Sequence, residues 1–400
     1  MVLCAVWPQK GFMSFQEIFA RAERLGQSLG ETALERDREG GTAKRERDQI
    51  RASGLLASSI PTDYGGYGAS WLEVMQLVRL ISGADSSLGH LFGFHHLLVA
   101  TVRLFGARDQ WEAAYRETAS QSLFWGNALN PLDPGTTLTR SDAGLSISGK
   151  KSFCSGARDS DRLIVSANDP ATGKLLVAAI PSTRAGIRYN QDWDNLGQRQ
   201  TDSGSVELDG VVIQDSELLT TPGPLGSPFA SLRPCIAQLV LGNVYLGIAQ
   251  GALAIAKPYT HTQRRAWPAS GASSASEDPY VLARYGEFYL QVESARLLAD
   301  AAASALDAAW NAKESVTPEA RGRAAVAIAA TKVATTRASL DISTRIFDVM
   351  GARSTTAKLR LDRFFRNART HTLHDPVDYK LKELGEWELS GKLPVPSFYS

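Results

Sequence analysis

The fold of this chain is decided by a change of sequence period, seen most clearly at Lys174-Leu175-Leu176-Val177-Ala178-Ala179-Ile180. Such a short apolar run between turn residues is typical of a β-strand. Three more strand-like runs occupy residues 145–149, 162–166 and 205–208, and Gly, Asp, Asn and Pro separate the four runs. Together the runs predict a small β domain over residues 122–230.

On both sides of this segment the sequence has the period of helices. Residues 14–121 follow a helical pattern that breaks at the polar run through Asp48 and at the turn-rich residues 61–68. A linker with four prolines and two glycines covers residues 220–234. Beyond it we expect alanine-rich helices at residues 236–262, 279–312, 318–350 and 362–373. The sequence therefore predicts an α+β protein with an N-terminal helical domain (14–121), the β domain, and a C-terminal four-helix bundle (231–400).

One of these helices has clear start and stop signals. Thr317 is suited to cap its first turn, Pro318 to occupy the first helical position, and Gly351 to end it after Met350 in the left-handed conformation.

The composition describes an enzyme-sized protein with a large core. The chain has 400 residues, of which 44% are hydrophobic, and its formal net charge of +1 gives no reason to expect nucleic acid. Cys4, Cys154 and Cys235 are scattered without C-x-x-C spacing, which fits a reducing cytoplasm and no disulfide framework. We find no apolar run of about 18 residues and therefore expect no membrane span. The apolar start from Val2 to Trp7 lacks the features of a signal peptide.

Five of the six histidines fall in two groups that are far apart in sequence. His90, His95 and His96 form one group, while His371 and His374 form the other, three residues apart and before Asp375-Pro376. The second pair shares one face if the helix continues that far, and the two groups predict one site built from both ends of the chain. A metal site of His90, His371, His374 and Asp375 is a minor alternative; no Glu-x-x-His pattern supports a di-iron centre, and we predict no metal.

Other features favour a cofactor between the β domain and the bundle. The turn at residues 150–157 offers backbone N–H groups, a hydroxyl and an aromatic ring to a flat heterocycle, and Trp193 with residues 197–204 offers a second edge. Arg264 and Arg265 at a helix end are able to clamp a phosphate. Each feature also has an ordinary explanation, as a plain turn or as a solvated helix C-terminus.

The order of these parts resembles the acyl-CoA dehydrogenase fold. The motifs that carry the resemblance are a Lys-x-Phe-Cys-Ser-Gly turn at residues 151–156, a Leu-Gly-x-Arg-Gln-Thr-Asp-Ser-Gly run at 196–204, and an Arg-x-Ala-Arg segment at 366–369. Within this fold the chain is most similar to the bacterial dibenzothiophene monooxygenases of desulfurisation and to indole-oxidising flavin monooxygenases, over residues 14–400. The resemblance implies an N-terminal helical domain, a central β-barrel or sandwich, and a C-terminal four-helix bundle.

An acyl-CoA dehydrogenase itself is the first alternative. Its catalytic glutamate stands in an Ile-Tyr-Glu-Gly motif, which aligns here with Leu373-His374-Asp375-Pro376. A shorter carboxylate held before a proline argues against proton abstraction from a substrate about 3 Å away. A non-catalytic oligomeric binding protein on the same scaffold is the second alternative.

The resemblance implies a two-component, reduced-flavin-dependent monooxygenase. A separate NAD(P)H:flavin reductase supplies FMNH2 or FADH2, and O2 reacts to give a C4a-(hydro)peroxyflavin that oxygenates an aromatic heterocycle, at an indole-type carbon or a thiophene-type sulfur. The catalytic residues that it implies are His90, Asn127, Ser155 and His374.

The same resemblance implies the binding residues and a homotetramer. The flavin contacts are Asn127, Phe153, Ser155, Trp193 and His374, with Arg265 and Arg353 reaching the cofactor of a neighbouring subunit. Phe94 and His371 are expected on the substrate side, where Phe94 replaces a tyrosine of the desulfurisation enzymes. His95 and His96 are expected to serve packing.

Overall fold

The computed structural model describes residues 13–142 and 144–400, so the apolar start and Cys4 lie outside the described residues. The N-terminal part is helical, as predicted. Ser14 and Ser70 form capping boxes with Glu17 and Glu73, which fixes where two of its helices begin. The helices are α1 (Phe15–Glu39), α2 (Lys44–Ser53), α3 (Trp71–Ala84), α4 (Ser86–Phe105) and α5 (Arg108–Gln121).

The central part is a mixed sheet that branches at one strand. Strand β4 pairs in parallel with β1 and β2 and antiparallel with β5, while β3, β7 and β6 extend the sheet beyond β2. Three of these strands, β1, β2 and β6, were not among the four expected from sequence. The strands are β1 (Trp125–Ala128), β2 (Thr136–Ser141), β3 (Gly144–Lys151), β4 (Arg162–Asp169), β5 (Lys174–Pro181), β6 (Ile187–Tyr189) and β7 (Val206–Ile213).

The C-terminal part contains three long helices and two short ones. They are α6 (Leu232–Gln263), α7 (Pro279–Asn311), α8 (Pro318–Met350), α9 (Asp362–His371) and α10 (Val377–Ser390). Thr317 caps α8 through Ala320 N–H, as predicted. Gly351 has a φ of 77° and a ψ of 175°, so its backbone is extended after a positive φ and is not in the left-handed helical conformation. Helix α10 was not expected from the sequence.

Helix α9 ends at His371, two residues earlier than predicted. His374 therefore lies in the turn between α9 and α10, and the expectation of two histidines on one helical face is wrong. The reason is local, because Pro376 disfavours a helical conformation at the residue before it and begins the next helix.

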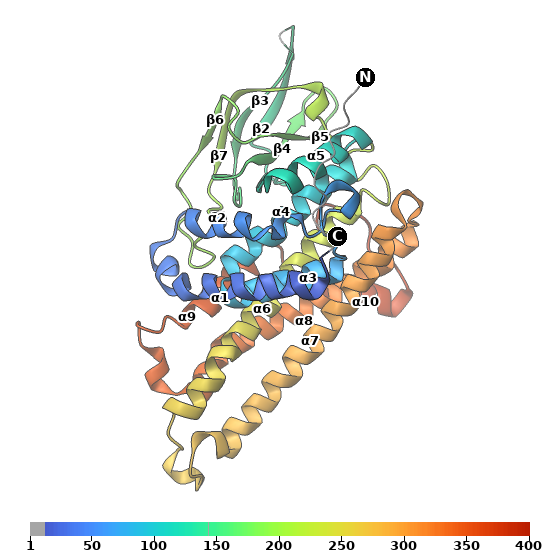
Figure 1. Cartoon of the computed structure of the whole chain (residues 1–400). Coiled ribbons are helices and arrows are strands. Elements are labelled where there is room, and N and C mark those ends of the chain that lie inside the picture. Colours follow the sequence, from blue (N-terminus) through green and yellow to red (C-terminus); the bar gives the residue numbers. More distant parts are fainter. Residues whose placement is uncertain (1–12, 143) are drawn as a thin grey trace.

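The β sheet sits at one end of the molecule, the N-terminal helices lie in the middle, and α6 and α7 project at the other end (Figure 1). One hydrophobic cluster runs through the N-terminal and the C-terminal helices, whereas a second, smaller cluster belongs to the sheet. The division of the helices into two domains remains a prediction from sequence, but their packing is continuous. Cys154 and Cys235 are buried and free.

Two helices are long and apolar enough to span a membrane by length and composition, namely α4 and α6. This corrects the expectation that no apolar run reaches that length. In the most apolar 18-residue segment of each helix, 94% of the residues of α4 and 83% of those of α6 are buried inside the protein. Such burial is typical of core helices.

Candidate active site

The two histidine groups meet in the fold. The ring centroids of His90 on α4 and His371 at the end of α9 are 4.5 Å apart, and Phe94 stacks on His90 at 4.1 Å. Only 3% of His90 is exposed, and burial lowers its pKa to about 3 and that of His371 well below the usual value. The Nδ1 atom of His90 and both ring nitrogens of His371 have no hydrogen-bond partner among the described residues. The site thus holds neutral imidazoles with free polar atoms.

His374 joins this cluster through the turn after α9. Its charge lowers the pKa of both His90 and His371, so all three imidazoles are within electrostatic reach. Its Nδ1 atom lies 2.9 Å from Asp375 Oδ1, and Lys332 Nζ donates to the same oxygen at 3.0 Å. Within residues 13–142 and 144–400, no group of three or more His, Cys, Asp or Glu residues is arranged to hold a metal ion.

The turn after β3 carries a chain of hydroxyl groups. Ser155 Oγ lies 2.7 Å from Ser203 Oγ, which donates to Thr201 Oγ1 at 2.7 Å. Asn127 N–H donates to Ser155 O at 3.1 Å, and the Asn127 side-chain oxygen accepts from Leu129 N–H. The Asn127 NH2 group has no protein partner within the described part of the chain. Ser155 and Asn127 therefore present polar groups from two adjoining segments.

Phe153 and Trp193 form an aromatic edge beside this turn. Phe153 is 61% exposed although its backbone has a φ of 56°, a strained conformation that non-glycine residues adopt mainly at functional sites. Its ring lies 6.1 Å from that of Trp193, whose Nε1–H donates to Gln198 O at 2.8 Å. An exposed aromatic in a strained turn is a suitable wall for a flat ligand.

The aromatic and hydroxyl segments are tied to the helices that carry the histidines. Gln198 N–H donates to Asn367 Oδ1 on α9 at 2.7 Å, and Gln198 Nε2 donates to Ser86 Oγ on α4 at 3.3 Å. A methyl group added at Gly156 would lie 3.0 Å from the side chain of Leu91, next to His90. These contacts bring the turn and the imidazole cluster to one region of the fold.

Arg265 and Arg353 lie elsewhere in the same chain. Both are exposed and have no ion-pair or hydrogen-bond partner among the described residues. They follow the ends of α6 and α8, and the neighbouring Arg264 joins these two helix ends by donating to Asp348 O.

The residues present fit a flavin. The isoalloxazine ring has a flat face that requires apolar or aromatic contacts and a polar edge that requires donors and acceptors. Phe153 and Trp193 would supply the first, and Ser155, Asn127 and the unpartnered Nδ1 of His90 would supply the second.

Comparison with known proteins agrees with this geometry. Sequence profiles of the acyl-CoA dehydrogenase N-terminal and C-terminal domains match residues 18–122 and 239–379. A probable FMNH2-dependent monooxygenase of Pseudomonas putida, SfnC, is 55% identical over 382 residues, which cover 95% of this chain and 97% of that protein. The chain belongs to the flavin-dependent monooxygenases of the acyl-CoA dehydrogenase fold.

Two solved structures of similar monooxygenases support the assignment. The methanesulfinate monooxygenase MsuC of Pseudomonas fluorescens is 54% identical with a TM-score of 0.94, over 97% of this chain and all of that one. TdsC of Paenibacillus sp. A11-2, solved with FMN and indole, is 44% identical with a TM-score of 0.91, over 95% and 99% of the two chains. These relatives favour the monooxygenase over the acyl-CoA dehydrogenase alternative.

The position of Asp375 also explains why a dehydrogenase is the weaker choice. Its carboxylate is buried and bonded to both Lys332 and His374. Burial alone would raise its pKa, but the hydrogen bond from His374 and the charge of Lys332 outweigh burial and hold the pKa well below its usual range. Such a carboxylate is a poor base for a substrate proton.

Sequence reasoning missed the groups behind the predicted site residues. Lys332 is fully buried in an alanine-rich stretch of α8. A single lysine among apolar residues in a helix could have indicated a buried ion pair. Ser203 lies in the conspicuous segment 196–204, but the sequence did not mark it as a partner of Ser155. Arg47 on α2 is also fully buried and donates to Gly156 O at 2.9 Å. It therefore supports the turn at residues 153–156 from a distant helix that no local pattern connects with it.

Proposed function

We propose that this monooxygenase binds reduced FMN between the turn at residues 153–156 and the histidine cluster, and uses O2 to oxygenate an aromatic heterocycle. The observation that carries the proposal is the pair of buried imidazoles, His90 and His371, whose ring nitrogens lack protein partners. When bound, reduced flavin would supply the two electrons that activate O2, of which one oxygen atom passes to the substrate and the other leaves as water. The FMN of the TdsC complex supports FMN over FAD.

In this proposal the protein residues have four roles. Asn127 donates a hydrogen bond to the polar edge of the flavin and Ser155 Oγ, whose proton goes to Ser203, accepts one there, while Phe153 and Trp193 line the ring. His374 and His90 share the third role beside the reacting oxygen: His374 holds and moves the proton, to which imidazole is suited near neutral pH, and His90, which burial keeps neutral, orients the oxygen by a hydrogen bond. Phe94 and His371 form the substrate side, and their burial excludes water that would divert the reaction.

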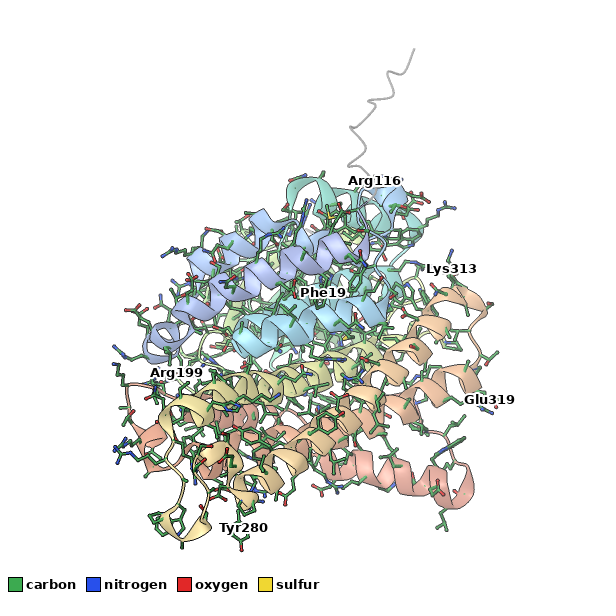
Figure 2. All side chains as sticks on the ribbon, turned by 60° about the horizontal axis from the view of Figure 1, so that its bottom comes forward. Phe19, Arg116, Arg199, Tyr280, Lys313 and Glu319 are labelled. Carbon is green, nitrogen blue, oxygen red and sulfur yellow. The ribbon has the colours of Figure 1, made fainter. Side chains whose placement is uncertain are left out.

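We propose that the active form is a homotetramer in which Arg265 and Arg353 reach the flavin phosphate of a neighbouring subunit. Helix α7 supports self-association because an exposed apolar stripe follows its outer face, formed by Leu282, Tyr289, Leu290 and Leu297. Tyr280 extends this surface, and Figure 2 shows it at the outer end of the hairpin, pointing away from the chain. A separate NAD(P)H:flavin reductase supplies the reduced cofactor by diffusion, and we place the enzyme in the cytoplasm.

A small alkanesulfinate is a second candidate substrate. His90 packs against Phe94 and edge-on against His371, with ring centroids 4.1 and 4.5 Å apart, and from this close packing we infer a narrow space on the substrate side. The relative MsuC is named a methanesulfinate monooxygenase and shares 54% of its sequence with this chain. A narrow site would favour one sulfinate group over a fused ring system.

The test supplies the purified enzyme with a flavin reductase, NADH, FMN and air, and offers indole, dibenzothiophene and methanesulfinate in separate reactions. We expect an oxygenated product from at least one substrate and its loss in His374→Ala. Product from methanesulfinate alone would replace the heterocycle with the second candidate. No product from any substrate, together with bleaching of bound flavin by an acyl-CoA without air, would refute the monooxygenase proposal.

A further inference from the structure

A buried chain of side chains runs behind His374 and ends inside the bundle. Lys332 Nζ on α8 donates to Gln238 Oε1 on α6 at 2.9 Å and to Asp375 Oδ1 at 3.0 Å. The same Asp375 oxygen lies 2.9 Å from His374 Nδ1. Four residues from three separate parts of the C-terminal half thus form one continuous hydrogen-bonded chain.

The degree of burial shows that this chain is costly to build. The Lys332 side chain is 0% exposed and that of Asp375 is 10% exposed, whereas His374 is 38% exposed. A buried ammonium is tolerated when a carboxylate pairs with it and hydrogen bonds satisfy its remaining protons. A well-packed apolar pair would serve stability at least as well, so the charged pair calls for a different explanation.

The explanation lies in what an ionised Asp375 does to the imidazole ring. A carboxylate is an acceptor only, so the His374 nitrogen that faces it must carry a proton. We infer that Lys332 and Asp375 are positioning residues for the proposed oxygenation: they fix His374 with Nδ1–H toward Asp375 and leave Nε2 to face the reacting oxygen. The same logic operates when a buried carboxylate fixes the tautomer of a catalytic histidine.

The surroundings of the pair contain other groups that affect its charge. Lys332 Nζ lies 5.2 Å over the ring of Tyr245, and burial raises the pKa of that tyrosine well above its usual value. Burial also raises the pKa of Tyr399, whose ring is 5.9 Å from that of His374. The titratable and charged groups that face the pair or His374 come from α4, α6, α9, α10 and the C-terminal segment, and are His90, Tyr245, His371, Lys380 and Tyr399.

The variants separate positioning from stability. Asp375→Asn removes the carboxylate and leaves Lys332 buried without a counter-charge, while Lys332→Met leaves Asp375 in the same state, so both should unfold more easily. The double variant Lys332→Met/Asp375→Asn contains no buried charge at this point and should recover most of the lost stability. Because it still lacks the carboxylate, it should not recover the orientation of His374.

The first readout needs neither flavin nor turnover. Nitrogen NMR of 15N-histidine-labelled protein, with His374→Ala for assignment, reports which ring nitrogen carries the proton. We expect the neutral His374 ring of the wild type to hold its proton on Nδ1, and a substantial Nε2–H population in Asp375→Asn and in the double variant. An unchanged proton position in both would overturn the inference, even if the proposed reaction is found.

The second readout is substrate oxygenation with flavin reductase, NADH, FMN and air, measured as a function of pH. All three variants should lose about 100-fold in product formation, the usual contribution of a positioned acid–base group, and should release more hydrogen peroxide per NADH. Recovery of wild-type turnover by the stable double variant would overturn the inference. If the wild type oxygenates no substrate, the proposed function fails while the NMR result still decides the positioning.

A matched control breaks a comparable ion pair elsewhere in the bundle. Arg79 is buried, and its Nη2 donates to Asp300 Oδ1 at 2.6 Å and to Asn243 Oδ1 at 2.9 Å. Arg79→Met should lower stability without changing the proton position of His374. A changed His374 spectrum in this control would mean that general loosening, and not the Lys332–Asp375 pair, governs the ring.

Discussion

Lowering the pH from 7.5 to 5.5 should destabilise this protein by several kcal/mol through its buried histidines. Burial lowers the pKa of His90 to about 3 and that of His95 to about 4, and it lowers those of His96 and His371 well below the usual value. The unfolded chain binds protons below pH 6.5 that these folded imidazoles do not bind. The stability that the fold gains from keeping these imidazoles neutral is therefore fully present above pH 6.5, and it is lost progressively as the pH falls toward 4.

The magnitude follows from the two pKa values of each group. At pH 5.5 a histidine with an unfolded pKa of about 6.5 and a folded pKa of 4 or below contributes about 1.4 kcal/mol less than at pH 7.5. His90 and His95 together give a loss of about 3 kcal/mol, and the lowered pKa values of His96 and His371 add to it in the same direction. Such a loss is a large part of the whole free energy of unfolding of many domains. Asp375 adds nothing to this loss, because its pKa is held below the usual carboxylate value and the group stays ionised from pH 7.5 to 5.5.

The assay is urea unfolding followed by tryptophan fluorescence at pH 7.5, 6.5 and 5.5, at one ionic strength and one protein concentration. His95→Gln is the matched variant, since His95 Nε2–H donates to Leu56 O at 2.8 Å and Trp125 N–H donates to Nδ1 at 3.3 Å. A glutamine amide can make both bonds and does not titrate. It should reduce the pH-dependent loss by about 1.4 kcal/mol. Equal unfolding free energies at pH 7.5 and 5.5, or an unchanged slope in His95→Gln, would refute the reasoning.

Three further predictions concern the flavin turn and the outer helix. Arg47→Met should cost about 1–3 kcal/mol of stability, because it leaves the buried Gly156 O without its donor while Asp159 keeps its ion pair with Arg51, and it should raise the Kd of FMN in a fluorescence titration. Gly156→Ala places a side chain at a φ of 64° and should lower the urea midpoint by the equivalent of about 1–2 kcal/mol. Leu290→Arg on α7, at a position 65% exposed in the single chain, should dissociate the oligomer in light scattering while the far-UV circular dichroism stays unchanged. A tetramer that persists in Leu290→Arg would show that this stripe is not the interface.

The long elements of the fold could be predicted because their signals are local. Thr317, Pro318 and Gly351 mark both ends of α8, and the apolar run at residues 174–180 coincides with β5. Strands β1, β2 and β6 escaped prediction because their stability comes from pairing with neighbours rather than from their own period. The end of α9 was misplaced because the conformation after His371 depends on Pro376 and on the contacts of His374 and Asp375.

The candidate site was predictable at its aromatic and imidazole groups, since histidines and the Phe153 turn stand out in the sequence. The residues that hold these groups in place could not be predicted. The residues that hold Asp375, the partner of His374, come from α8 and α6: Lys332 is 43 residues from Asp375 in sequence, and no spacing rule links them. The buried position of His371 likewise depends on Tyr245, whose hydroxyl donates to His371 O at 2.8 Å.

The single hydrophobic cluster shared by the helices before and after the sheet has a consequence for engineering. Exchanging only the first hundred residues with a relative would combine core residues of two different proteins in one hydrophobic cluster. The side-chain volumes would then not match where α3 and α4 pack on α6. Chimaeras intended to alter substrate scope should therefore transplant both helical segments as a unit. The sheet has an additional interior of its own, but Trp125, Ile164 and Val177 also belong to the shared cluster, so a transplanted sheet would need to keep these three residues.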